Sequence, residues 1–213
     1  MATKADTLAS MDQWLEKLKE EVHVLTVNEY VFWEIQKIIR RNKQLKVPSE
    51  FYGWMGRMYV GGMSVGIRRQ LDTDTRSESL FRFLTRLKGN PSLISRKHYR
   101  SLYPKKQKAY ADRVYDRFVG KGRKQPLFSQ IDRQIETLWR RSAGIVCYAN
   151  RKIAHMDATP PSSVPKFGDV GRTVRYLEKL IQHYVQLFRA VHLNMRVNIV
   201  YDWLAIFRIP WIR

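Results

Sequence analysis

The sequence predicts an all-α protein that folds as a helical bundle. Eleven glycines and eight prolines make up about 9% of the 213 residues, against ~12% in an average protein, so long stretches lack the residues that interrupt helices. In several stretches apolar residues recur with alternating spacings of three and four, which places them on one face of a helix. The chain shows no repeat of about 20 to 50 residues and no low-complexity tract, which favours one domain over residues 1–213.

The first predicted element is an amphipathic helix near the N-terminus. Its apolar stripe consists of Leu8, Met11, Leu15, Leu18, Val22 and Leu25. The β-branched residues between Val22 and Val27 favour a bend, after which helical spacing resumes with Val31, Ile35, Ile38 and Ile39. The basic residues from Arg40 to Lys43 suit the C-terminal end of this helix, where the helix dipole is negative.

A second helix, capped by Ser49, is predicted to follow Pro48. Its interior holds Gly53, Gly56, Gly61, Gly62 and Gly66. Each of these glycines costs roughly 1 kcal/mol relative to alanine. Their spacing matches neither GxGxxG nor a Walker A loop, so we expect them to allow close approach of a neighbouring helix.

A turn and a shorter helix come next. The turn is predicted at Asp74-Thr75-Arg76-Ser77, and Ser79 is the expected cap of a helix whose apolar residues are Leu80, Phe83, Leu84 and Leu87. Gly89-Asn90-Pro91 ends that helix.

Residues 94–126 hold nearly half of the surplus positive charge. Eleven Lys/Arg and two Asp give them a net charge of +9, within +20 for the whole chain. Such a surface attracts polyanions, and four interleaved tyrosines (Tyr99, Tyr103, Tyr110, Tyr115) would offer ring faces to the bases of a single strand. Packing of these tyrosines into the core is the alternative. We predict a basic helical segment that binds nucleic acid through Arg96, Lys97, Arg100, Lys105, Lys106, Lys108, Lys121, Arg123 and Lys124.

The C-terminal half contains the two strongest helical patterns. One starts at Phe128 with Ser129 as its cap and continues to about Ala154; the other is capped by Asp169 and continues to about Val191. Between them, residues 156–168 form a proline-containing loop. The apolar and aromatic tail, residues 194–213, is expected to pack on the bundle or on a partner.

Composition bounds the class of protein. With 44% apolar and 12% aromatic residues the chain is not disordered, and its charges interrupt every apolar stretch too soon for a membrane span. Cys147 is the lone cysteine and no apolar signal segment is present, so we expect a cytoplasmic protein without disulfides or membrane insertion. The absence of GxSxG, HExxH and CxxC spacings argues against triad hydrolases and zinc sites, and we expect neither a metal nor a cofactor.

One segment combines groups that carry chemistry. Asn150-Arg151-Lys152-Ile153-Ala154-His155-Met156-Asp157 brings an amide, a guanidinium, an imidazole and a carboxylate together where a helix is expected to end. It resembles the Arg/Asn-Lys-x-x-Ala-His-x-Asp signature of HEPN domains, in particular the AbiU-like group of abortive-infection proteins. The resemblance extends more weakly to Arg69–Asp72, Ser79–Leu80 and the loop from Pro160 to Phe167.

The resemblance implies a helical bundle that forms a homodimer around its motif helices and, in active members, cleaves RNA without a metal. His155 would then move protons at the 2′-hydroxyl and the leaving 5′-oxygen, and Arg151 would hold the phosphate. Asn150 and Asp157 would orient the imidazole or contact the ribose. For each of these side chains, capping or pinning the helix end is the structural alternative.

Two functional hypotheses follow, because three residues separate Arg151 from His155 whereas active members have four to six. The first is an RNA-directed endoribonuclease of phage defence or toxin–antitoxin type. The second is a catalytically inactive HEPN protein that binds nucleic acid or acts as a scaffold. Expected partners are RNA or single-stranded nucleic acid, a second copy of the chain, and an antitoxin or other defence protein. A module for anionic membranes would explain the charge, but the cations do not share one polar helical face.

Overall fold

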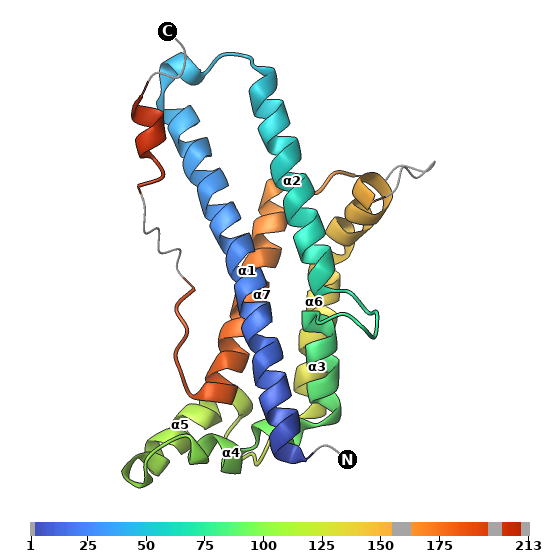
Figure 1. The fold of residues 1–213 in the computed structure, drawn as a ribbon, viewed down its shortest axis with the longest axis vertical. Helices are drawn as coiled ribbons and strands as arrows, with labels where there is room; N and C mark the ends of the chain where they lie inside the picture. The colour runs from blue at the N-terminus through green and yellow to red at the C-terminus, as the bar shows by residue number, and fades with distance from the viewer. Residues whose placement is uncertain (1–2, 155–162, 196–201, 210–213) are drawn as a thin grey trace.

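The computed structural model describes residues 3–154, 163–195 and 202–209. Within these residues the structure contains helices and no strand, which confirms the predicted all-α class. The molecule is elongated, with the N-terminus and helices α4 and α5 at one end and the α1–α2 connection at the other (Figure 1). The α-helices are α1 (Lys4–Arg41), α2 (Glu50–Gln70), α3 (Leu80–Gly89), α4 (Arg96–Ser101), α5 (Lys108–Val119), α6 (Phe128–Tyr148) and α7 (Phe167–Arg189).

Helix α1 spans almost the whole length of the molecule. It begins at the capping residue Thr3, whose hydroxyl accepts a hydrogen bond from the amide of Asp6, and it continues without interruption for 38 residues, about 57 Å. The bend that the β-branched residues favour does not interrupt the helix. The helix stays continuous because it packs against α7 and α2. The predicted stripe is correct, since Met11, Leu15, Leu18 and Val22 are all fully buried.

The prediction of close helix approach along α2 is correct at only part of the glycine set. A Cβ atom built on Gly66 would lie 2.6 Å from Leu25 Cδ2 of α1, and one on Gly56 would lie 3.3 Å from Phe167 Cζ. In contrast, a Cβ atom on Gly61 or Gly62 would meet nothing within 4 Å. The glycine pattern therefore marks two points of contact and an open surface between them.

Two of the predicted caps are correct and two are wrong. Ser49 and Ser79 cap α2 and α3 with their side-chain oxygens. Helix α6 begins at Phe128 with Leu127 as its capping residue, whose amide donates to Gln130 Oε1 at 2.9 Å, so Ser129 lies inside the helix. Helix α7 begins three residues earlier than predicted, with Lys166 at the cap position and Asp169 in the first turn, where Arg172 pairs with it.

The helix predicted to continue to Ala154 changes type on the way. Helix α6 ends at Tyr148, and a π-helical turn, η4 (Ala149–Ala154), follows it directly. The π-turn has wider i→i+5 hydrogen bonding, so residues 149–154 do not follow the α-helical spacing predicted for them. Such turns often occur at functional sites.

The C-terminal tail is described in two pieces. Met195 is buried, whereas the short helix η5 (Ala205–Arg208) lies at the same end of the molecule as the α1–α2 connection (Figure 1). Asp202 and Arg208 form an ion pair of 2.9 Å, and Trp203 contacts Phe207 edge to face. In the described part of the chain, no helix has the length and apolar character needed to cross a bilayer.

The two kinds of glycine in α2 lead to opposite predictions. Gly62→Ala should raise the free energy of unfolding by about 0.5–1 kcal/mol, because alanine favours the helix and its methyl group meets no neighbour. Gly66→Ala should lower it, because the methyl group would overlap Leu25. Urea unfolding of both variants measures this, and a stabilised Gly66→Ala protein would contradict the packing between α1 and α2.

A buried histidine should make stability depend on pH. His183 lies between the rings of Phe118 and Tyr184, and burial lowers its pKa to about 4. The unfolded chain, in which histidine titrates near 6.5, then binds more protons in this range, so stability falls by up to about 1.4 kcal/mol per pH unit as the pH drops from 6.5 toward 4. In urea unfolding at several pH values, His183→Gln should flatten this decline. His23→Gln, an exposed control, should leave it unchanged.

Candidate functional site

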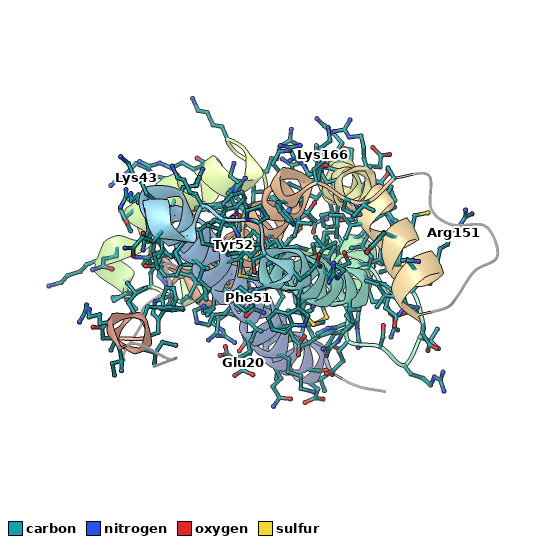
Figure 2. All side chains as sticks on the ribbon, turned by 90° about the horizontal axis from the view of Figure 1, so that it is seen from above. Glu20, Lys43, Phe51, Tyr52, Arg151 and Lys166 are labelled. Carbon is teal, nitrogen blue, oxygen red and sulfur yellow. The ribbon has the colours of Figure 1, made fainter. Side chains whose placement is uncertain are left out.

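The motif segment leaves α6 on the π-helical turn. Asn150 is half-buried, and its Oδ1 accepts a hydrogen bond from Nε of Arg68 in the last turn of α2. Arg151 and Lys152 are exposed, and Arg151 lies at the edge of the molecule when it is seen from above (Figure 2). His155 and Asp157 lie outside the described residues. The structure therefore assigns Asn150 a contact that holds the turn against α2, and it places Arg151 at the surface.

A cationic cleft lies between α6 and the start of α7, close in the chain to this segment. It encloses about 340 Å³, and its charged lining residues are Arg140, Arg141, Lys166, Asp169 and Arg172. Four cations and one carboxylate give the lining a net charge of +3. Gly144 and the backbone of residues 163–165 complete the walls. The cleft, here called the α6–α7 cleft, has the charge and size to hold a phosphate group.

The contacts inside the α6–α7 cleft orient its cations. Arg141 lies over the ring of Tyr176 at 5.1 Å, and its carbonyl oxygen accepts a hydrogen bond of 3.1 Å from the Thr173 hydroxyl. Arg172 pairs with Asp169, whereas no ion pair of Arg140 occurs within the described residues. No side chain caps the first turn of α7, so the positive end of that helix adds to the field in the cleft.

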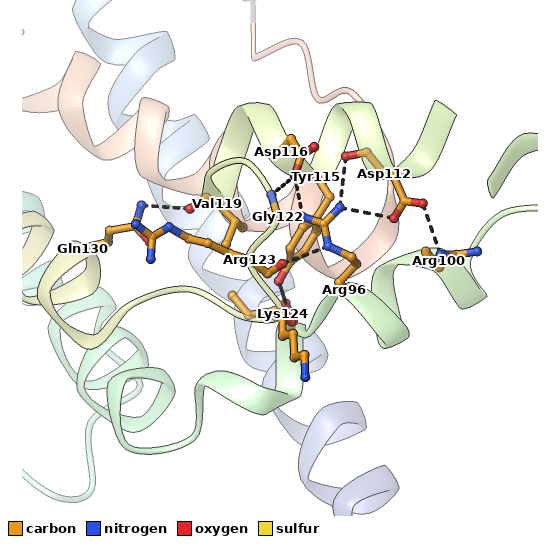
Figure 3. A network of polar contacts seen from close by, with 11 residues as sticks. Arg96, Arg100, Asp112, Tyr115, Asp116, Val119, Gly122, Arg123, Lys124 and Gln130 are labelled. Carbon is orange, nitrogen blue, oxygen red and sulfur yellow. Dashed lines mark hydrogen bonds and ion pairs between the residues drawn. The ribbon is translucent and has the colours of Figure 1, made fainter. Parts of the chain in front are cut away.

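The predicted nucleic-acid-binding residues lie at the opposite end of α6. Some of them are engaged in contacts within the fold, and the others are exposed to solvent. Arg96 is a structural residue, with only 18% of its side chain exposed. It pairs with Asp112 at 3.3 Å and with Asp116, donates to the carbonyl of Arg123 at 2.8 Å, and covers the ring of Tyr115 (Figure 3). Its geometry does not support a role in phosphate binding.

Lys108 is also engaged within the fold, because its ammonium donates to the carbonyl oxygens of Arg100 and Tyr103. The remaining predicted side chains are exposed, although Arg100 pairs with Asp112 at 3.2 Å. A groove of about 430 Å³ gathers Arg96, Lys97, Arg100 and Lys124 between α4 and the loop that follows α5. We call this the α4 groove. The exposed cations of this end are Lys97, Arg100, Lys105, Lys106, Lys121, Arg123 and Lys124.

The prediction of a tyrosine stacking surface is wrong for most of the set. Tyr99 and Tyr115 are fully buried, and burial raises the pKa of both phenols. The Tyr115 hydroxyl donates to the carbonyl of Ile94 at 2.8 Å, and the Tyr99 hydroxyl accepts from Gln186 at 2.6 Å. Tyr103 is half-buried, so Tyr110, 52% exposed, is the one ring of the four that faces solvent. The alternative, packing into the core, is the one that the structure supports.

The two cationic regions lie at opposite ends of α6. The α4 groove adjoins the chain just before α6, and the α6–α7 cleft lies toward its C-terminal end, in a helix about 30 Å long. Between them, Arg133 lines a smaller hollow beside His183, two helical turns before Arg140. Between the two regions α6 therefore exposes one cation, Arg133, and one carboxylate, Glu136.

Sequence reasoning missed the residues of the α6–α7 cleft. Arg140 and Arg141 belong to a helix that was predicted from its apolar stripe, so its polar face was not considered. Lys166 and Arg172 follow the motif in the sequence, whereas the two arginines precede it. The available signal was the Arg-Arg pair on the polar face of that helix.

A scan against protein-family models, a search of curated proteins and a search of solved structures each found no match for the chain.

Proposed function

We propose that the chain is a HEPN-type, RNA-directed protein of phage defence or toxin–antitoxin type, and that it acts as a metal-independent endoribonuclease. The observation that carries this proposal is the α6–α7 cleft, whose cations lie at the end of α6 from which the motif segment emerges. Charge supports a polyanionic substrate, and the motif residues supply groups for phosphate transfer. The resemblance to HEPN domains selects RNA among the polyanions.

Binding would follow the length of α6. A single strand would contact the exposed cations around the α4 groove, pass Arg133 and reach Arg140 and Arg141 in the α6–α7 cleft. This path lets the most basic part of the chain act as an anchor although it lies far from the motif. Affinity would come from phosphate contacts, because most of the predicted tyrosine rings are buried.

Cleavage would use the 2′-hydroxyl of the RNA as the nucleophile. His155 accepts the proton of that hydroxyl and the 2′-oxygen bonds to phosphorus. The bond to the 5′-oxygen breaks as that oxygen receives a proton from a protonated imidazole, either that of the same His155 or that of His155 in a second copy. Arg151 neutralises charge on the phosphate during the step. The products are a 2′,3′-cyclic phosphate and a free 5′-hydroxyl.

The second candidate is a HEPN protein that binds RNA without cutting it. It is favoured by Asn150, which stands five residues before His155, where active HEPN members often have the arginine, and which accepts a hydrogen bond from Arg68 of α2. A homodimer through the motif helix and control by an antitoxin or other defence partner remain predictions under either candidate.

Replacing the paired arginines of the cleft tests the binding path. Arg140→Gln/Arg141→Gln should weaken binding of labelled single-stranded RNA and reduce the slope of log affinity against log salt by up to about 1.4, at ~0.7 for each lost phosphate contact. Lys43→Gln/Lys46→Gln removes the same charge from the connection between α1 and α2, outside the proposed path along α6, and is the matched control. Equal losses in both variants would mean that only the overall charge attracts RNA.

Cleavage is tested with labelled RNA in EDTA between pH 6 and 8. The wild-type protein should release products with 2′,3′-cyclic phosphate ends, and His155→Ala or Arg151→Ala should slow this by on the order of 100-fold or more with little change in RNA affinity. If the RNA stays intact with wild-type protein, or if His155→Ala cuts it equally well, the ribonuclease proposal is wrong and the non-cleaving candidate takes its place.

A further inference from the structure

Large apolar side chains are exposed at the end of the molecule opposite α4 and α5. They belong to the connection between α1 and α2 and to the first turns of α2, and their exposed fractions are 57% for Val47, 54% for Phe51, 52% for Trp54 and 54% for Met58. The rings of Phe51 and Trp54 stack on each other at 5.6 Å. We call these four residues the apolar tip. Four such side chains in one place exceed the single exposed apolar residues that are normal on a protein surface.

An apolar groove continues the tip between α1 and α2. It encloses about 310 Å³, and Trp54 and Met58 belong both to the tip and to the groove. Val31 and Ile35 of α1 form the opposite wall, and Gly62, which has no neighbour within 4 Å of a Cβ position, leaves one side open. The lining contains no charged side chain.

Cations are frequent in the part of the chain that carries the tip. Residues 40–58 contain five Lys/Arg and one Glu, a net charge of +4. The exposed Arg40 and Arg41 end α1, and the exposed Lys43 and Lys46 lie in the connection that also contains Val47. None of the four forms an ion pair within the described residues. Figure 2, a view onto this end, labels Lys43 and Phe51, which lie apart in it.

We propose that this end of the molecule docks peripherally on an anionic lipid bilayer. Phe51 and Trp54 would enter the interfacial layer, where aromatic rings are favoured, and the surrounding cations would contact anionic headgroups. The sequence argument against a membrane module required the cations to share one helical face. The fold instead gathers them around apolar residues in a connection between two helices.

Other occupants fit the tip less well. A second copy would bring two surfaces of like charge together, and four side chains offer much less than the ~800 Å² per partner of a stable interface. A nucleic acid could stack on Trp54 and Phe51, but Val47, Met58 and the uncharged groove offer it neither a ring face nor a phosphate contact.

Co-sedimentation with vesicles tests the proposal at 0.15 M salt. Wild-type protein should bind vesicles of phosphatidylcholine with 30% phosphatidylglycerol and not vesicles of phosphatidylcholine alone. Phe51→Ser/Trp54→Ser keeps the full charge of the chain and should weaken binding at least tenfold. Lys43→Gln/Lys46→Gln should weaken it about 30-fold, whereas Arg140→Gln/Arg141→Gln, with the same loss of charge, should retain binding within about threefold.

The same variants show what would overturn the proposal. Unchanged vesicle binding by Phe51→Ser/Trp54→Ser would mean that the net charge alone attracts the lipid. A wild-type dimer in light scattering that this variant converts to a monomer would assign the tip to a second copy, and a matching loss of RNA affinity would assign it to nucleic acid. Circular dichroism checks that these exposed substitutions leave the helices intact. Loss of RNA cleavage in the motif variants bears on the proposed ribonuclease only, so the two proposals fail separately.

Discussion

The antiparallel pairing of α1 with α7 is the constraint on which the rest of the structure depends. Two sets of ion pairs fix its register. Near the end of α7, Arg189 pairs with Asp12 at 2.7 Å and with Glu16, and nearer its start Arg175 pairs with Glu29 at 2.8 Å. Glu29 is buried, and burial raises its pKa in spite of Arg175. Gly171 makes the close approach possible, because a Cβ atom there would overlap the Glu29 carboxylate.

This register leaves one end of α1 without α7. Helix α7 begins at Phe167, whose ring packs against Phe32, so α7 does not reach the last turns of α1. Among the described residues, α2 and the short turn η1 (Lys43–Leu45) pack beside those turns. The apolar residues of those turns are covered on one side, and the groove between α1 and α2 stays open to solvent. The apolar tip thus follows from the different lengths of two helices, 38 and 23 residues.

Helix α6 connects the two cationic regions to the pair of α1 and α7. Its first turn follows the loop that Arg96 holds against α5, and its last turn leads into the π-helical segment that Asn150 and Arg68 hold against α2. Because both ends are tied to the bundle, the exposed arginines between them keep a fixed direction from the α4 groove to the α6–α7 cleft. A strand bound along α6 would therefore arrive at the motif end in one orientation.

The sequence by itself determined the helical class, the apolar stripes of the long helices, the caps at Ser49 and Ser79 and the concentration of cations in residues 94–126. These features are local, since spacing along one helix or one hydrogen bond to a neighbouring amide decides them. Tertiary structure decided which cations are available to an anionic ligand. Arg96 forms ion pairs with Asp112 and Asp116. Arg140 of α6 meets Lys166 and Arg172, at the start of α7, in one cleft. Tertiary structure also turned most of the predicted tyrosines inward and left Phe51 and Trp54 outside. The physical reason is that a ring or a charge has its environment set by the elements packed against it, and the register of α1 and α7 that determines this packing depends on contacts between residues more than 140 positions apart.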